Sequence, residues 1–415
     1  MKNKIISVSL SPNTEKDDTR LAFGFLFRFW QWKKGKYIPK LENRFSEKFG
    51  LSHCLSFNSG RSCLLAALNA IDIQEGDEII LQSFTCNAVA NPILKSKAKP
   101  VYIDIGQDLN IDVNKIEEKI TPKTKAIIAQ HTFGMPADID KIVSICQKHK
   151  LILIEDCAHA LGAKINGQYC GTFGDMSFFS FGRDKVISSV YGGMLAINNP
   201  DLLKKAADFQ NKLAYPANSW TIRQLLHPVL VNYLVFPMYN IVIGKVLMAL
   251  FINLGILSKA VTRGESQGVL PDYFPRKLPN ALAALALHQL EKLEKFNTHR
   301  KEIASYYEKE LENISKYKLI FKDYAANKEP IFMKYPMLMD NPKELMEKMR
   351  INKIYLSDGW SDSAIMPPAT ALEKMIYSEG SCVTAEDISK KIFSLPTHIN
   401  ISSEDAKKIV DLLKN

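Results

Sequence analysis

The sequence predicts an α/β protein: a large domain built on a mostly parallel, mixed sheet, followed by a smaller C-terminal α+β domain. Between about residues 50 and 200, short β-branched or aromatic runs alternate with amphipathic stretches, as βαβ units do. After residue 280 the pattern changes to long helices and then to a mixed segment. We therefore divide the chain into an N-terminal extension, 1–37, a large domain, 38–280, and a small domain, 281–415.

Each predicted element has its own signal. The strands are short apolar runs bounded by polar or turn residues, and the helices show apolar residues at i, i+3 and i+4 spacing. Asn166-Gly167 is typical of a two-residue hairpin tip. The predicted strands cover 78–84, 99–105, 125–133, 150–156, 175–181 and 192–198, and the predicted helices cover 61–71, 137–149, 281–296, 300–314 and 403–414.

The composition is that of a globular protein, because 46% of the 415 residues are apolar and 24% are charged. A net charge of +10 is compatible with nucleic acid, an anionic membrane or phosphorylated substrates. We expect no nucleic-acid binding, since basic runs of that type and zinc-finger spacing are absent from the sequence. The seven cysteines are odd in number and never form C-x-x-C, which predicts a reduced, cytoplasmic chain. His131 and His398 have no third ligand at metal-binding spacing, so we expect no metal site.

Three short motifs carry candidate chemistry, and each also has a purely structural interpretation. Ser59 and Gly60 open a predicted helix, where free N–H groups and the helix dipole favour a phosphate, or where Ser59 is simply a cap. Asp156 and His159 follow a buried strand at the sheet edge where ligands bind in α/β proteins. The alternative for Asp156 is a helix N-cap.

The third motif is Lys185, which follows an aromatic strand and precedes Ser188, Ser189 and Gly192-Gly193. Partial burial would lower the pKa of its amine and make it a nucleophile, whereas a surface lysine would be solvated. A phosphate cradle, a strand-end carboxylate and a lysine about thirty residues later form the set that pyridoxal phosphate (PLP) chemistry requires. The lysine bonds the aldehyde, the carboxylate keeps the pyridine nitrogen protonated, and the helix terminus holds the phosphate.

At this point the sequence resembles the DegT/DnrJ/StrS family of PLP-dependent sugar aminotransferases, from about Pro39 to the C-terminus. The resemblance implies the aspartate aminotransferase-like architecture, PLP fold type I. The matching stretches include SGRSCLLAAL, GDEIILQSFTCNAVANPIL, LILIEDCAHALGA, GTFGDMSFFSFGRDK, NALAALALHQLEKLEKF and SLPTHINISSEDAKKIV. Their order and spacing together are highly specific.

The resemblance also implies roles for individual residues. Lys185 occupies the Schiff-base position, and Asp156 the position that pairs with the pyridine nitrogen. Ser180 matches the serine at the cofactor phosphate. Gly60 and Arg61 align with the Gly-Thr whose amides bind that phosphate, with Arg61 in place of threonine and able to add a charged contact. The remaining cofactor position, beside the ring hydroxyl, falls on His159.

Several positions depart from the family pattern. Cys86 stands where many members stack an aromatic ring on the cofactor. Val190-Tyr191-Gly192-Gly193 replaces Gly-Glu-Gly-Gly, and residues 274–277 replace the Asn-Tyr-Arg motif that reaches the neighbouring subunit's site. We therefore assign Arg276 or Lys277 to the substrate phosphate.

The function implied is a homodimeric PLP-dependent aminotransferase. It moves an amino group from an amino acid, glutamate or glutamine, to a keto-sugar carried on a nucleotide, in cell-surface glycan or related biosynthesis. One alternative is a family member that acts on a different keto substrate. Another is a dehydratase, but dehydratases resembling this family replace the lysine with histidine, so Lys185 argues against it. The third is a non-catalytic, membrane-associated sensor or scaffold.

An apolar insertion at 214–262 interrupts the large domain. No Asp or Glu occurs from Phe209 to Gly264, and Lys245 is the single charge in 224–258. Prolines and asparagines break the run, so we expect no spanning helix. Two interpretations remain: a hairpin buried in an enlarged subunit interface, or peripheral attachment to the inner face of the membrane together with the aromatic, lysine-rich segment 21–37.

Overall fold

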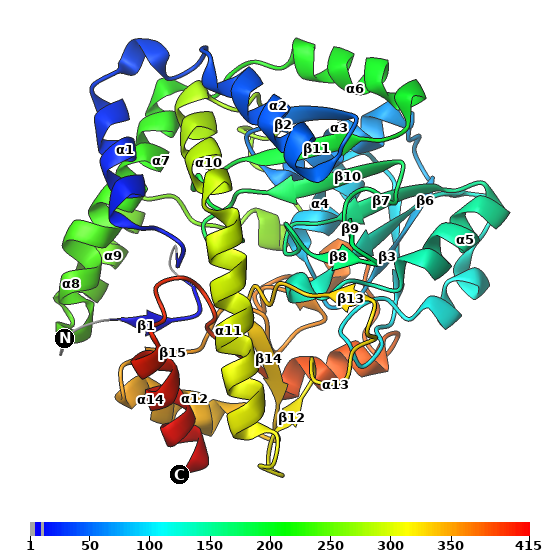
Figure 1. Ribbon diagram of the computed structural model, residues 1–415. Helices are drawn as coiled ribbons and strands as arrows, with labels where there is room; N and C mark the ends of the chain where they lie inside the picture. The colour runs from blue at the N-terminus through cyan, green and yellow to red at the C-terminus, as the bar shows by residue number, and fades with distance from the viewer. Residues whose placement is uncertain (1–4, 10–11) are drawn as a thin grey trace.

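Seven strands form the central sheet of the structure, a computed structural model that describes residues 5–9 and 12–415. Their spatial order is β2-β11-β10-β7-β6-β3-β5, and all are parallel except β11, which is antiparallel to both neighbours (Figure 1). The strands are β2 (His53–Phe57), β3 (Glu78–Gln82), β5 (Lys99–Ile103), β6 (Thr124–Gln130), β7 (Ile152–Asp156), β10 (Met176–Ser180) and β11 (Gly193–Ile197).

All six predicted strands are confirmed in this sheet. Strand β2 was not among them, because its first three residues are exposed or only half-buried and so lack a continuous apolar run. The hairpin at Asn166-Gly167 is also confirmed: it joins β8 (Lys164–Ile165) to β9 (Gln168–Tyr169). Both turn residues have positive φ, 51° and 77°, as a tight two-residue turn requires.

Helices cover both faces of the sheet, and alternate strand residues face each layer. Ile79 and Leu81 of β3 join the core formed with one set of helices, whereas Ile80 joins the core on the opposite face. The first set is α3 (Gly60–Ala70), α4 (Asn87–Lys95) and α6 (Pro200–Lys212); the second includes α2 (Tyr37–Phe49), α5 (Ile139–His149) and α10 (Asn280–Glu291).

Besides the core on the two faces of the sheet, a second core lies beyond the sheet, and the long helix α11 (Leu293–Leu311) extends into it. The two helices predicted at 281–296 and 300–314 have a different boundary, because Lys292 ends α10 and α11 begins at the next residue. The predicted last helix is confirmed as α14 (Ser403–Lys414), which begins with a capping box at Ser402. The other elements here are β12 (Lys318–Leu319), β13 (Lys328–Glu329), β14 (Tyr335–Leu338), α12 (Pro342–Ile351), β15 (Ile354–Tyr355), β16 (Ile365–Met366), α13 (Val383–Lys391) and β17 (Ile392–Leu395).

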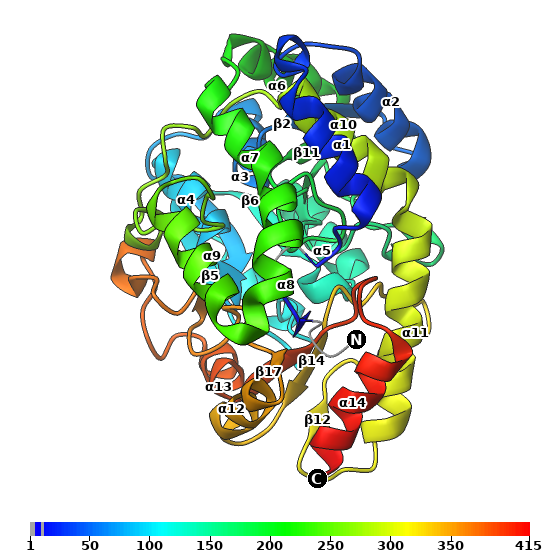
Figure 2. The same ribbon diagram turned by 90° about the vertical axis from the view of Figure 1, so that its left-hand side faces the viewer.

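The start of the chain contacts both parts of the molecule. Strand β1 (Ile6–Ser7) pairs in parallel with β15, and α1 (Lys16–Leu26) packs against α7 of the insertion. The insertion itself is helical: α7 (Asn218–Leu230), a π-helical turn (Val231–Val235), α8 (Phe236–Met238) and α9 (Ile243–Asn253). Figure 2 shows α1, α7, α8 and α9 together on one side. Across the described ranges, none of the helices has the length and apolarity needed to cross a membrane.

Candidate active site

One pocket, at the carboxyl ends of β7 and β10 and the start of α3, collects the side chains that the sequence singles out. Its other walls come from the second core, at 333–334, 358–360 and 366–367, and from 260–261, just after the insertion helices. The predicted residues that line it are Ser59, Gly60, Arg61, Cys86, Asp156, His159, Ser180 and Lys185.

The amino terminus of α3 and Ser180 form the anion-binding end of the pocket. Ser59 caps the helix, since its Oγ accepts a hydrogen bond of 3.1 Å from the Ser62 amide, so the capping interpretation is confirmed. Ser180 lies directly opposite, because a Cβ placed on Gly60 would come within 3.4 Å of the Ser180 Cβ. At Gly193 of β11, a Cβ would come within 2.7 Å of the Ser59 carbonyl carbon. Small residues thus let three backbones converge where a helix dipole and a hydroxyl can bind an anion.

Asp156 supplies a buried carboxylate at the end of β7. It accepts a 2.9 Å hydrogen bond from the Ala158 amide, and no helix follows it, so the N-cap interpretation is wrong. Burial raises the pKa of Asp156 to about 6, although the Ala158 bond and the charge of Lys185 oppose that shift. A cation placed against this carboxylate would therefore be strongly stabilised.

Lys185 lies in the loop between β10 and β11 and is half-buried in the pocket wall, so the solvated-surface interpretation is wrong. Removal from water lowers the pKa of its amine, while Cys86 and Asp156 oppose this shift. A larger fraction of neutral amine, the nucleophilic form, is available near neutral pH than for a surface lysine.

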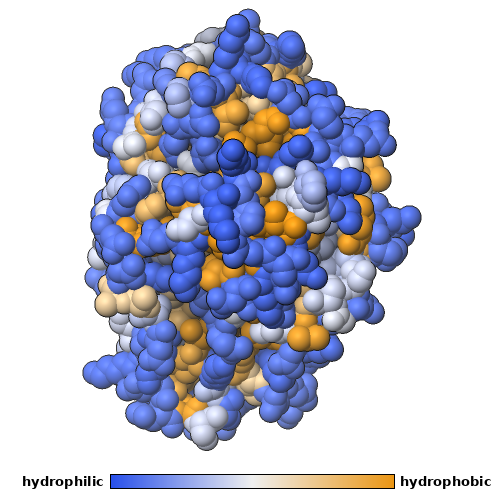
Figure 3. All heavy atoms as spheres, turned by 90° about the vertical axis from the view of Figure 1, so that its right-hand side faces the viewer, coloured by the Kyte–Doolittle hydropathy of each residue, from blue (hydrophilic) through white to orange (hydrophobic). Residues whose placement is uncertain are grey.

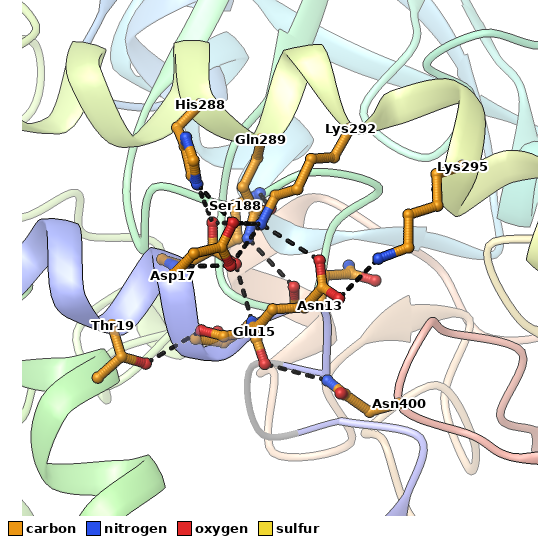
Figure 4. A network of polar contacts seen from close by, with 12 residues as sticks. Asn13, Glu15, Asp17, Thr19, Ser188, His288, Gln289, Lys292, Lys295 and Asn400 are labelled. Atoms are coloured by element: carbon orange, nitrogen blue, oxygen red, sulfur yellow. Dashed lines mark hydrogen bonds and ion pairs between the residues drawn. The ribbon is translucent and has the colours of Figure 1, made fainter.

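The Lys185 loop is held from behind by the N-terminal segment and by α10 and α11. The Asn13 side chain donates to the carbonyl oxygen of Lys185, and Arg300 donates to Val186 O at 2.8 Å. Gln289 accepts a 2.7 Å hydrogen bond from the Ser188 amide and donates to Asn13 O at 3.1 Å, as Figure 4 shows. Sequence reasoning missed Asn13, Gln289 and Arg300, because nothing in their local sequence indicates partners so far away along the chain.

His159 lies in an aromatic cluster that closes one side of the pocket. Its ring stacks on Phe133 at 5.6 Å between centroids and meets the edge of Trp360 at 4.9 Å. Burial holds the pKa of His159 well below its usual range, so the ring is neutral, with Nδ1 accepting from the Phe133 amide at 3.4 Å. Lys334, paired with Asp358, places its Nζ 3.9 Å from the centroid of the Phe133 ring. Sequence reasoning missed Trp360 and Lys334, which no local motif marks.

Cys86 is the N-cap of α4, where its Sγ accepts a 3.5 Å hydrogen bond from the Ala88 amide. Burial raises the pKa of this thiol, so it is protonated and contributes a small, uncharged wall to the pocket. The contact of Cys86 with the cofactor stays a prediction.

Arg61 points its guanidinium toward the segment that follows the insertion. Its Nε lies 2.5 Å from Glu265 Oε1, and its Nη2 donates to Ala260 O at 2.9 Å. Its charged phosphate contact stays a prediction. The Arg276 main-chain amide donates to the Asn58 side chain, and Lys277 Nζ donates to Asn211 O. Neither Arg276 nor Lys277 is among the described residues that line this pocket.

His131 has a structural explanation. Its Nδ1 accepts from the Ala137 amide and its Nε2 lies 3.0 Å from Glu155, which in turn accepts three main-chain amides of the 171–174 turn. Although His131, Glu155 and Cys157 are close enough to hold an ion, both ring nitrogens are already occupied. His398 bonds Ser7 O at 2.7 Å and also lines the pocket. The absence of a metal stays a prediction.

The sequence model of the DegT/DnrJ/EryC1/StrS aminotransferase family matches residues 16–220 and 250–414. The chain belongs to this family. It is therefore a PLP-dependent aminotransferase with the fold type I architecture that the sequence predicts. The internal stretch that the model leaves unmatched, 221–249, falls in the helical insertion, and the match includes part of the N-terminal segment 1–37. The domain boundaries stay a prediction.

Individual curated proteins and solved structures are also similar to this chain. GDP-perosamine synthase of Escherichia coli O157:H7 is 29% identical over 90% of this chain and 88% of that protein. GDP-perosamine synthase of Vibrio cholerae is 39% identical over a shorter stretch, 44% of this chain and 50% of that relative. The structure of Helicobacter pylori PseC, an aminotransferase involved in the biosynthesis of pseudoaminic acid, superposes with a TM-score of 0.76 and 23% identity, over 99% of both chains.

Proposed function

We propose that this enzyme moves an amino group from glutamate or glutamine to a keto-sugar carried on a nucleotide, in glycan biosynthesis. The observation that carries the proposal is the meeting of Lys185, Asp156 and the amino terminus of α3 in one pocket. The GDP-perosamine synthases among its relatives, whose names specify a nucleotide-linked amino sugar, support the substrate class. The net charge of +10 suits a diphosphate substrate.

The pocket residues fit PLP. Asp156 is a buried carboxylate whose pKa is raised by burial. A protonated pyridine nitrogen beside it would supply a compensating positive charge. The start of α3 and the Ser180 hydroxyl suit the phosphate, and the Lys185 amine suits the aldehyde carbon. PLP, when bound, supplies an electron sink for the carbon that loses its proton.

Each pocket residue then has a defined task. Asp156 would hold a proton at the ring nitrogen, because a cation beside its carboxylate offsets the cost of burying that negative charge. The Lys185 amine would accept a proton from one carbon and return it to another, and its lowered pKa suits this exchange near neutral pH. The aromatic cluster of Phe133, His159 and Trp360 excludes water from that transfer.

We also propose that the enzyme is a cytoplasmic homodimer in which the turn at 274–277 reaches the partner's pocket. Two observations support this assignment. The main-chain amide of Arg276 is held by Asn58, two residues before Gly60. Arg276 is also not among the described residues that line the pocket of its own subunit. In a dimer, Arg276 or Lys277 would supply the cation for a substrate phosphate.

The test is a two-stage assay of the purified enzyme. Loaded enzyme should absorb visible light, and glutamate or glutamine should bleach it; adding a nucleotide keto-sugar should then restore the band and yield the amino sugar. Lys185→Ala is the matched control. A colourless protein after incubation with PLP, or a band that no amino donor bleaches, would contradict the proposal.

A further inference from the structure

The insertion exposes an apolar face that the rest of the fold leaves uncovered. On α9 and at its C-cap, Ile243, Val246, Leu250 and Leu254 follow one another at spacings of three and four residues, and Val246 and Leu254 are 60% and 63% exposed. We name this the insertion face; with its neighbours it consists of Tyr233, Leu234, Ile241, Val242, Ile243, Val246, Leu250 and Leu254. An ordinary surface helix would turn such a stripe toward the core.

The insertion helices form a hairpin, and the inner side of this hairpin is anchored to the rest of the protein. The direction in which the insertion face points is therefore fixed. Gly244 lies so close to the preceding turn that a Cβ there would come within 2.3 Å of Val235 O. Lys245 places its Nζ 5.1 Å from the centroid of the Tyr355 ring, and Lys353 donates to Asn240 O at 3.3 Å. These contacts tie the hairpin to β15.

A second exposed apolar group lies on the same side of the molecule. Phe23 and Phe27 of α1, followed by Phe29 and Trp30, are 49% to 66% exposed. Helix α1 packs against α7, and Figures 1 and 2 show α1, α7, α8 and α9 along one side of the molecule. Of the seventeen large apolar side chains exposed among the described residues, these two groups supply twelve. By contrast, the opposite side presents mainly hydrophilic residues with separated apolar groups (Figure 3).

The charges on these segments all have one sign. No Asp or Glu occurs in 19–41 or in 209–264. Exposed cations within these two segments include Arg28, Lys33, Lys34, Lys36, Lys259 and Arg263. Aromatic and aliphatic side chains beside lysine and arginine form the combination that binds an anionic lipid surface.

We propose that the insertion face and the aromatic group dock on an anionic bilayer, a property beyond amino transfer. The protein lies on the membrane rather than crossing it, because α9 has eleven residues, about 16 Å, against a hydrocarbon thickness of about 30 Å. A second copy is a poorer occupant, since a two-fold interface would set these cations against themselves. The charge pattern therefore favours lipid phosphates.

The test is co-sedimentation of the full-length enzyme with vesicles of phosphatidylcholine alone or of phosphatidylcholine and phosphatidylglycerol in equal parts. We expect binding to the mixed vesicles only, lost at high salt. Val246→Asp should weaken binding about tenfold, because it places a charge in the apolar face. Val383→Asp, at an equally exposed valine on α13, should bind as the unaltered protein does.

Three further measurements keep the test decisive. Circular dichroism should show that both variants are folded, and their amino-transfer rates in solution should be unchanged, which separates docking from the proposed function. Light scattering should give both the same mass as the unaltered protein. The proposal is overturned if the full-length protein ignores anionic vesicles, if it binds neutral ones equally well, or if Val246→Asp reduces the mass to that of a monomer, which would mean that a second copy covers the face.

Discussion

Arg300 and Asn13, 287 residues apart in the sequence, share a 2.7 Å hydrogen bond from the guanidinium Nη2 to the amide oxygen. The same amide group donates to the carbonyl oxygen of Lys185, so one asparagine joins the buried arginine of α11 to the loop of the reactive lysine. Burial lowers the pKa of Arg300 to about 9, and its hydrogen bonds hold the charge in place. The N-terminal segment is therefore part of the active-site support.

Asn13→Ala should slow turnover by about tenfold, because the Lys185 loop loses its donor and misplaces the amine. It should also lower the free energy of unfolding by about 2 kcal/mol, since Arg300 is left with a buried unpaired donor. Steady-state kinetics and urea unfolding measure the two effects. Asn400→Ala is the control: it removes bonds to Pro12 O and Thr14 O in the same segment without touching the loop. Equal losses of turnover in both variants would count against a specific role of Asn13.

Lys185→Ala should abolish the visible band of the loaded enzyme and reduce turnover by at least ~10³-fold, because the amine that moves the proton is gone. Lys334→Ala, which removes a second lysine that lines the described pocket, should keep the band. Absorbance spectra after PLP loading make the comparison. A Lys185→Ala enzyme that still turns over normally would refute the assignment.

Asp156→Asn should retain PLP but slow turnover by orders of magnitude, since an unprotonated pyridine is a poor electron sink. The cofactor-free protein offers a second readout. Because folding raises the pKa of Asp156 from 3.8 to about 6, the folded state binds more protons than the unfolded state between these values, and stability falls as pH rises through this window.

The total loss above pH 6 is about 3 kcal/mol from this group, and Asp156→Asn should remove it. Urea unfolding of both cofactor-free proteins at pH 4 and pH 7 gives the difference. Parallel pH profiles for the two proteins would show that the carboxylate does not carry the raised pKa.

Gly193→Ala should weaken PLP binding more than about tenfold and destabilise the protein by about 1–3 kcal/mol, because the new methyl group meets the backbone at Ser59 and Gly60 and displaces the start of α3. Gly24→Ala is the matched control, since its Cβ meets nothing within 4 Å and it lies inside α1. That variant should gain up to about 1 kcal/mol. Titration with PLP and thermal unfolding measure both, and unchanged affinity in Gly193→Ala would place the phosphate elsewhere.

The sequence by itself determined the α/β class, six strands of the central sheet and the set of pocket residues that form the proposed PLP site. These follow from local signals: apolar periodicity, the Asn166-Gly167 turn, and the motifs at Gly60, Asp156 and Lys185. Strand β2 was not predicted, because an edge strand need not be apolar throughout. The boundary between α10 and α11 was not predicted either, because an almost continuous helix leaves no turn signal at Lys292.

Only the tertiary structure decided what surrounds those motifs. Asn13, Gln289 and Arg300 support the Lys185 loop, and Trp360 and Lys334 close the pocket. These contacts join segments that are more than 100 residues apart, and no local pattern encodes them. The contact of Arg61 with Glu265 also depends on a distant segment. The opposite charge of Glu265 compensates the cost of burying the Arg61 guanidinium. The direction of the insertion also belongs to the tertiary structure, because the close contact of Gly244 with Val235 and the contact of Lys245 with Tyr355 fix which side of α9 is buried and which meets the solvent.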